Sequence, residues 1–157
     1  MLEVTYKKLS EELEQLKTYE RGNIAAIIDE ARAQGDLKEN AEYHAAKDEQ
    51  GLMEARINEL TDLVGRAQVV NPSELAHERV SFGSTVEMTD QKTDEEIIYT
   101  IVGVTESSPS KGLISIQSPM ARAMLGKEEG DEVTLTLPSG QKTYDIESIS
   151  YVEIVLN

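Results

Sequence analysis

The stretch YHAAKDEQGLMEARINELTDLVGRA (residues 43–67) decides the architecture of the chain. Its apolar positions recur with strict 3-4-3-4 spacing, at Tyr43, Ala46, Gln50, Met53, Ile57, Leu60, Val64 and Ala67. Gln50 is the one polar member of this seam. Such a heptad seam packs one helix against another, so the stretch predicts a long helix that has a helical partner.

The partner is expected upstream, because residues 1–70 contain no proline and are rich in the helix formers Glu, Leu, Ala, Lys and Gln. The apolar positions there are Leu9, Leu13, Leu16, Ile24, Ile27 and Ala31. The step of eight between Leu16 and Ile24, with Gly22 inside it, predicts a register slip or a weak point. Two helices of roughly 30 residues, each about 45 Å long, then form an antiparallel hairpin around a link at residues 35–40.

A change of composition at Asn71-Pro72 predicts a domain boundary. We assign residues 1–75 to the hairpin and residues 76–157 to a second domain. Strands are expected at residues 85–88, 97–102, 113–116, 133–137 and 144–155, with a turn at 138–140 and a short helix at 119–125. The fold class is therefore α+β, with a small antiparallel sheet packed on one short helix.

Charge and composition exclude several classes of function. The 157 residues include 30 acidic and 15 basic side chains, a formal net charge of -15, which opposes binding to DNA or RNA by the chain alone. The absence of cysteine excludes a disulfide framework, a thiol nucleophile and a thiolate zinc site. No signal-peptide layout and no run of about 20 apolar residues is present, so we expect a cytoplasmic protein without a membrane partner.

The link between the two helices holds a pair of carboxylates, Asp36 and Glu39, three residues apart. Asp36 is one candidate for the N-cap of the second helix, with Glu39 completing a capping box. Asn40 is the other candidate, and it would leave both carboxylates available in the loop. Two carboxylates suit Mg²⁺, but they are too few for a tight site. An exposed hairpin also lacks the enclosed cavity of a metalloenzyme, so this tip would give half a metal site to another macromolecule.

The stretch ARAQGDLKENAEYHAAK (residues 31–47) resembles the tip of bacterial Gre transcript-cleavage factors, the GreA/GreB family. The segments Phe82-Gly83, Ser118-Pro119 and Leu125-Gly126-Lys127 are also similar to that family, and the likeness covers nearly the whole chain. The resemblance implies an N-terminal coiled-coil hairpin and an FKBP-like C-terminal domain. It also implies that the C-terminal domain docks at the secondary channel of RNA polymerase.

By the same resemblance, Asp36 and Glu39 are the catalytic residues of the tip. They hold an Mg²⁺ ion that is shared with the polymerase active centre and is not bound tightly by the isolated chain. The polymerase then cuts its own backtracked RNA, so the protein stimulates a reaction without being an enzyme. The expected partners are RNA polymerase and the 3′ end of the nascent RNA, and the expected state is a monomer.

The resemblance assigns further contacts. Tyr43 lies next to the cleavage site, and Arg32 and Lys47 face the extruded RNA. Ser118 and Pro119 contact the rim of the polymerase.

Two other functions stay open at this point. A Gre-like inhibitor would plug the same channel without cleavage, although such relatives crowd more acidic residues at the tip, and here Lys38 separates Asp36 from Glu39. A peptidyl-prolyl isomerase is suggested by the implied C-terminal fold alone. Phe82 is the only phenylalanine and there is no tryptophan, so an aromatic proline pocket is poorly supplied.

Overall fold

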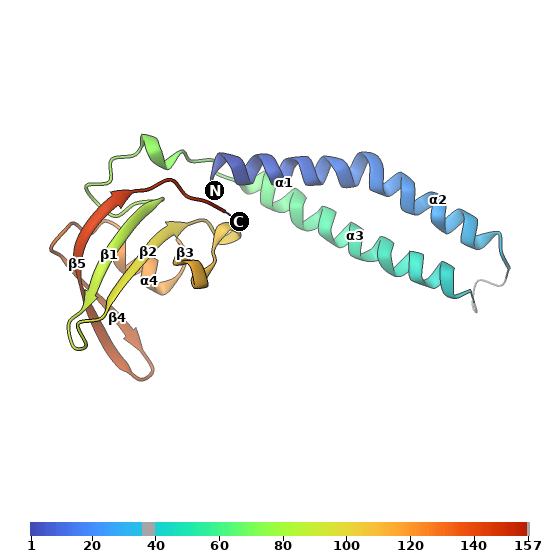
Figure 1. Ribbon diagram of the computed structural model, residues 1–157. Helices are drawn as coiled ribbons and strands as arrows, with labels where there is room; N and C mark the ends of the chain where they lie inside the picture. The colour runs from blue at the N-terminus through green and yellow to red at the C-terminus, as the bar shows by residue number, and fades with distance from the viewer. Residues whose placement is uncertain (36–39, 157) are drawn as a thin grey trace. The chain divides into compact units, whose positions relative to one another are not determined.

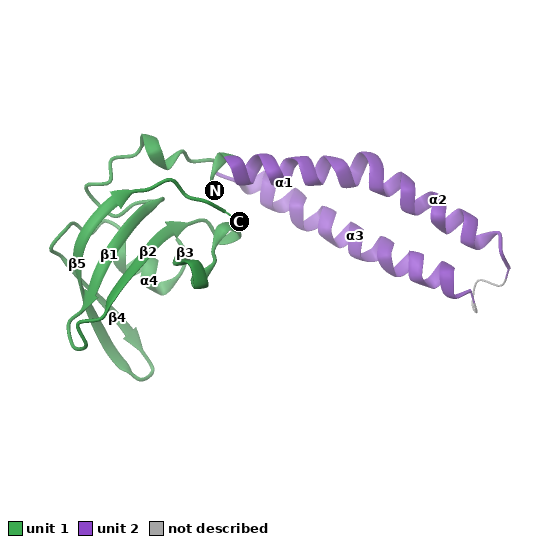
Figure 2. Cartoon of the chain, viewed as in Figure 1, with its two compact units in different colours: residues 1–3, 69–157 green, residues 4–68 purple. Residues whose placement is uncertain are grey.

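The computed structural model describes residues 1–35 and 40–156, which fall into two compact units (Figures 1 and 2). One unit is Val4–Gln68, and the other is Met1–Glu3 together with Val69–Asn157. The first is helical and the second is built on a five-stranded sheet. None of the helices in the described part of the chain is long and apolar enough to cross a bilayer.

The helical unit is the predicted antiparallel hairpin (Figure 1). Its first arm runs without a break through α1 (Glu3–Gln15), a π-helical segment (Leu16–Glu20) and α2 (Arg21–Arg32). Its second arm is α3 (Ala41–Arg66). The α3 seam is confirmed, because each residue predicted for it between Tyr43 and Ala67 is buried or half-buried.

The predicted register slip is the π-helical segment, which lies inside the eight-residue step from Leu16 to Ile24. A π turn takes up one extra residue, so eight residues here complete the two turns that seven would complete in a regular coiled coil. The prediction of Ile27 as the next seam residue is wrong. Ile28 is 5% exposed and Ile27 is 48% exposed, because after the π segment the seam runs through Ile24, Ile28 and Ala31.

Two arginine–glutamate pairs join the arms on either side of the π segment. The guanidinium of Arg56 donates to both carboxylate oxygens of Glu12, at 2.8 and 3.0 Å. Arg21 makes the equivalent pair of bonds to Glu54, both at 2.9 Å. These hydrogen bonds lower the pKa of Glu12 and of Glu54. Bidentate geometry adds directional preference to each of these contacts between the arms.

The second unit contains a curled sheet with the strand order β3-β2-β1-β5-β4. The strands are β1 (Ser84–Asp90), β2 (Glu96–Val102), β3 (Leu113–Ser115), β4 (Glu132–Leu137) and β5 (Gly140–Tyr151). The prediction that β5 continues to residue 155 is wrong, because its neighbour β1 begins at Ser84, which pairs with Tyr151. The turn before β5 is in the predicted place.

The sheet is antiparallel, as predicted, except at one edge where β3 runs parallel to β2. Parallel neighbours need a crossover connection. Here the crossover contains two 3-10 turns, Val104–Glu106 and Pro109–Lys111. Those turns have no apolar period, so the sequence pattern gave no sign of the parallel pair.

The short helix α4 (Pro119–Met124) packs on one face of the sheet and confirms the predicted helix to within one residue. Ser118 caps it by accepting a hydrogen bond from the backbone N–H of Ala121 at 3.2 Å. Ala121 and Met124 are fully buried in a core shared with the inward-facing strand residues Val86, Met88, Ile101, Val133 and Ile146. α4 and the sheet therefore bury a single apolar core.

A buried carboxylate fastens the first residues of the chain to this unit. Glu106 is 5% exposed and accepts hydrogen bonds from the backbone N–H groups of Leu2, at 3.0 Å, and Gly103, at 3.1 Å. The carbonyl of Met1 accepts a further bond from the N–H of Val70 at 2.9 Å. The residue that precedes the first arm is thus bonded to the segment that follows the second arm.

Candidate functional site

The base of the hairpin tip is described on both sides of the loop. α2 ends at Arg32, Gly35 has a positive φ of 135°, and α3 begins at Ala41. The two predicted catalytic residues, Asp36 and Glu39, lie outside the described residues, so their assignment stays a prediction. The described part of the site therefore consists of the residues on either side of this loop, up to residue 35 and from residue 40 on.

Asn40 is the N-cap of α3. Its Oδ1 accepts a hydrogen bond from the backbone N–H of Tyr43 at 3.1 Å, and its own carbonyl accepts from the N–H of His44 at 3.1 Å. Of the two N-cap candidates in the sequence, Asn40 is the right one and Asp36 is not. Asn40 thus supplies the side-chain acceptor that the N-terminus of α3 requires.

The same Asn40 side chain also reaches α2. Its Nδ2 donates a hydrogen bond to the carbonyl of Ala31 in the last turn of that helix. Ala31 is 3% exposed and lies in the seam between the arms. The two arms are therefore bonded to one another at the point where the loop leaves them. The sequence offered Asn40 as one of two cap candidates and gave no sign of this second bond, because nothing in the local pattern identifies a partner nine residues away.

Two of the three residues predicted to face RNA lie together at the loop base. The guanidinium carbon of Arg32 is 6.0 Å from the centroid of the Tyr43 ring, within the range of a cation–π contact. Tyr43 is half-buried and packs against the cluster formed by Ile24, Ile28 and Ala46. An aromatic ring with an exposed cation above it thus stands on a rigid seam.

Lys47, the third predicted residue, lies one helical turn further along α3. Its side chain is exposed, and its Nζ donates to the Oε1 of Gln50 at 3.0 Å. Lys47 is thus oriented by its own helix and not by the Arg32–Tyr43 pair. The structure brings the predicted cations to the same end of the hairpin but not into one cluster.

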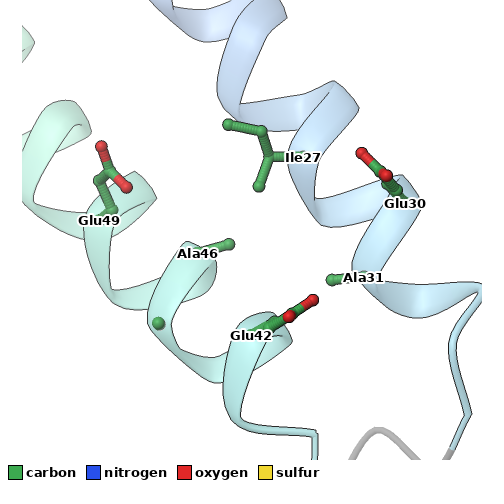
Figure 3. A pocket seen from close by; sticks show the side chains of 7 residues that line it. Ile27, Glu30, Ala31, Glu42, Ala46 and Glu49 are labelled. Atoms are coloured by element: carbon green, nitrogen blue, oxygen red, sulfur yellow. The ribbon is translucent and has the colours of Figure 1, made fainter.

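An acidic groove lies between α2 and α3 beside this base (Figure 3). Ile27, Ala31 and Ala46 line it, and its charged side chains are Glu30, Glu42 and Glu49. Figure 3 shows the Glu42 side chain reaching across toward Ala31. Sequence analysis missed this groove, although the seven-residue spacing of Glu42 and Glu49 on α3 places them on the same face.

The groove does not form a metal site by itself. Within residues 1–35 and 40–156, no three acidic or histidine side chains are close enough to hold a metal ion together. A hard cation needs several oxygen ligands. The groove therefore adds negative potential beside the loop base.

The predicted docking residues Ser118 and Pro119 lie at the start of α4 in the sheet unit. The hydroxyl of Ser118 is used as the helix cap, whereas Pro119 is exposed at the first position of the helix. A partner at this place would meet the proline ring first. Phe82 is only 9% exposed, so its ring contributes little surface that a proline ligand could contact.

Two models of protein families match the chain. One, described as "Transcription elongation factor, N-terminal", matches residues 1–69. The other, described as "Transcription elongation factor, GreA/GreB, C-term", matches residues 75–151. Together they cover both the helical hairpin and the sheet unit.

The chain is also similar to individual proteins named transcription elongation factor GreA. It is 76% identical to the one from Sulfurovum sp. over 99% of this chain and 96% of that protein. It is 57% identical to the one from Nautilia profundicola over 98% of this chain and 95% of that protein. Among solved structures, GreA factor homolog 1 of Thermus thermophilus matches 92% of this chain and 94% of that one at 30% identity, with a TM-score of 0.43.

Proposed function

The chain belongs to the GreA/GreB family of transcription elongation factors, and we propose that it stimulates RNA polymerase to cleave its own backtracked transcript. The observation that carries this proposal is the set of residues at the tip of the hairpin. Two carboxylates, Asp36 and Glu39, occur in the link between the hairpin arms, and Arg32 and Tyr43 stand at the base of that link. The relatives are named elongation factors, which favours cleavage stimulation over a channel-plugging inhibitor.

The dimensions of the hairpin suit delivery of a group over a distance. An unbroken arm from Glu3 to Arg32 is about 45 Å long at 1.5 Å per residue. Interhelical arginine–glutamate pairs and a continuous seam stiffen it along its length. A narrow, stiff arm can enter a channel that a compact domain cannot, so the tip would act inside the polymerase.

The donor set of the loop fits Mg²⁺. Carboxylate oxygens are the protein ligands that this hard cation takes, and it keeps one or two of them together with water and phosphate oxygens. Asp36 and Glu39 would hold the ion jointly with the polymerase active centre. The ion, when bound, stabilises charge on the attacking and leaving oxygens of phosphodiester cleavage. The two carboxylates would also orient the attacking water by accepting its hydrogen bonds.

The residues at the loop base would position the RNA. Arg32 and Lys47 supply positive charge for phosphate oxygens, and Tyr43 offers a ring face and a hydroxyl next to them. Two cations give only weak affinity for RNA, so they would orient an RNA end that the polymerase already holds. Contacts through Ser118 and Pro119 would dock the sheet unit on the polymerase rim. In this scheme the catalytic centre belongs to the polymerase, and the chain is not an enzyme.

Cleavage of RNA in stalled, backtracked polymerase complexes tests the proposal. Asp36→Ala and Glu39→Ala should each lower the maximal cleavage rate by about 100-fold, the scale of losing one charged, preorganised group at a reacting centre. Asp48→Ala is the matched control, because Asp48 is an exposed acid on α3 beyond the tip. It should cleave like the unmodified protein.

Two results would refute the proposal. The first is release of RNA fragments at the unmodified rate by both tip variants. The second is strong inhibition of nucleotide addition on complexes that are not backtracked, without any cleavage, which would establish the inhibitor instead.

A further inference from the structure

We propose that Asn40 is a positioning residue that fixes the base of the carboxylate loop and thereby sets where Asp36 and Glu39 are presented. The inference rests on the proposed function, since it concerns the same loop. The juxtaposition that carries it is one side chain bonded to both hairpin arms.

The amide of Asn40 has two different partners, and each end suits only one of them. The backbone N–H of Tyr43 is a donor, so it must face Oδ1. The carbonyl of Ala31 is an acceptor, so it must face Nδ2. This orientation satisfies both partners, and the reversed amide would satisfy neither.

Both partners are themselves fixed by packing. Ala31 is 3% exposed in the interhelical seam, and Tyr43 packs against the buried Ile24 and Ile28. The Ala31 carbonyl is in the last turn of α2, where a helix leaves acceptors without their usual partners. It also accepts the N–H of Gln34 at 3.2 Å. Asn40 therefore connects two points that are each held by packing in the seam between the arms.

Capping alone does not require asparagine. Ser, Thr and Asp cap helices about as well, because the cap needs only a short side-chain acceptor. None of them offers an N–H₂ group that can donate to Ala31 while an oxygen accepts from Tyr43. The second bond is thus the specific contribution of asparagine here.

The expected consequence is catalytic. The bond from Asn40 to Ala31 fixes the separation of the two loop ends, which lowers the number of conformations open to the residues between them. A shift of about 1 Å in a reacting group costs about 100-fold in rate, so a looser loop base should slow cleavage without weakening attachment to the polymerase.

The test compares two variants that keep the cap and lose the bond to Ala31, Asn40→Ser and Asn40→Asp. In the backtracked-complex assay, each should lower the maximal cleavage rate by about tenfold. The protein concentration that gives half-maximal stimulation should stay within twofold of the unmodified value. Asn71→Ser is the matched control, because Asn71 caps a 3-10 turn through the N–H of Ser73 in the sheet unit. It should change neither quantity.

The outcomes separate this inference from the proposed function. If Asp36→Ala and Glu39→Ala lose cleavage while both Asn40 variants cleave at the unmodified maximal rate, the positioning role of Asn40 is refuted and the proposed function stands. A raised half-maximal concentration with an unchanged maximal rate would equally refute it, since that is a docking defect. If Asn40→Ser loses helicity by circular dichroism, the same two measurements on Asn40→Asp decide.

Discussion

Inserting one residue at Thr18 should destabilise the hairpin, whereas deleting Thr18 should not. An alanine inserted after Thr18 rotates α2 by about 100° relative to α1, because each helical residue turns the chain by that angle. Ile24 and Ile28, each 5% exposed, then leave the seam. At about 1.5–3 kcal/mol for each buried isoleucine, the insertion should cost about 3–6 kcal/mol. The Ala31–Asn40 bond is lost with the same rotation.

Deletion of Thr18 should be tolerated. It shortens the step from Leu16 to Ile24 from eight residues to seven, which a regular helix in a coiled coil spans in two turns. The π segment then becomes a regular α-helix, and Ile24 and Ile28 still point toward α3. The only described bond that Thr18 itself makes through its side chain is local, from its hydroxyl to the carbonyl of Glu14 at 2.7 Å. We expect a change of less than about 1 kcal/mol, within the range of a surface substitution.

Urea denaturation of the full chain, followed by far-UV circular dichroism, measures the difference. The deletion variant should retain the unfolding midpoint of the helical transition and stimulate cleavage of backtracked RNA to within about threefold of the unmodified rate. The insertion should lower that midpoint and abolish stimulation. Equal destabilisation by both variants would show that the π segment does not hold an extra residue. In a helix without an extra residue, an insertion and a deletion both rotate the apolar side chains out of the seam.

Two further predictions concern the glycines of the sheet unit and the ion pairs of the hairpin. Gly83→Ala should destabilise the chain by about 2–5 kcal/mol, because φ is +84° and the new Cβ would lie 2.2 Å from the Cβ of Pro72. Gly126→Ala is the control, because its φ is +81° but the new Cβ would meet open space. It should cost only about 1–2 kcal/mol in the same denaturation experiment. The lowered pKa of Glu12 means that its pair with Arg56 stabilises the hairpin above the ordinary glutamate pKa and loses that contribution as the pH falls through the lowered pKa. Glu12→Gln should therefore remove about 0.5 kcal/mol at pH 7 and progressively less as the pH is lowered into the acid range. A loss that stays constant as the pH falls would contradict it.

Much of the fold follows from the sequence because its signals are local and periodic. The seam from Tyr43 to Ala67 repeats over several turns, and the proline, serine and glycine around α4 are the usual residues of a helix start and stop. The failures occurred where one extra residue or a long-range pairing decides. A step of eight indicates a slip, but it does not say that Ile28 and not Ile27 resumes the seam. The parallel placement of β3 depends on a crossover whose residues have no period.

The sequence names the residues of the tip but does not indicate their contacts, and the catalytic roles of Asp36 and Glu39 stay a prediction. The acidic link, Arg32 and Tyr43 are visible in the sequence, and helix geometry is enough to bring the last two to the loop base. The double use of Asn40 was not predictable, because the N-cap pattern explains that residue fully and leaves no unexplained feature. Because the N-cap role already accounts for asparagine at this position, the sequence does not indicate its bond to Ala31.

The charges at the tip give a physical reason why the activity would need the polymerase. Two carboxylates are too few to bind Mg²⁺ tightly, and two cations, Arg32 and Lys47, are too few to hold RNA against a net charge of -15. The affinity of the isolated chain for Mg²⁺ and for RNA therefore stays weak. The negative charges of Glu30, Glu42 and Glu49 beside the loop base weaken RNA binding further. A centre that already holds a metal ion and an RNA end would supply the remaining metal ligands and RNA contacts together. In the proposed mechanism, docking would raise the local concentration of the tip at that centre, so a pair of weak ligands on a stiff arm would be sufficient.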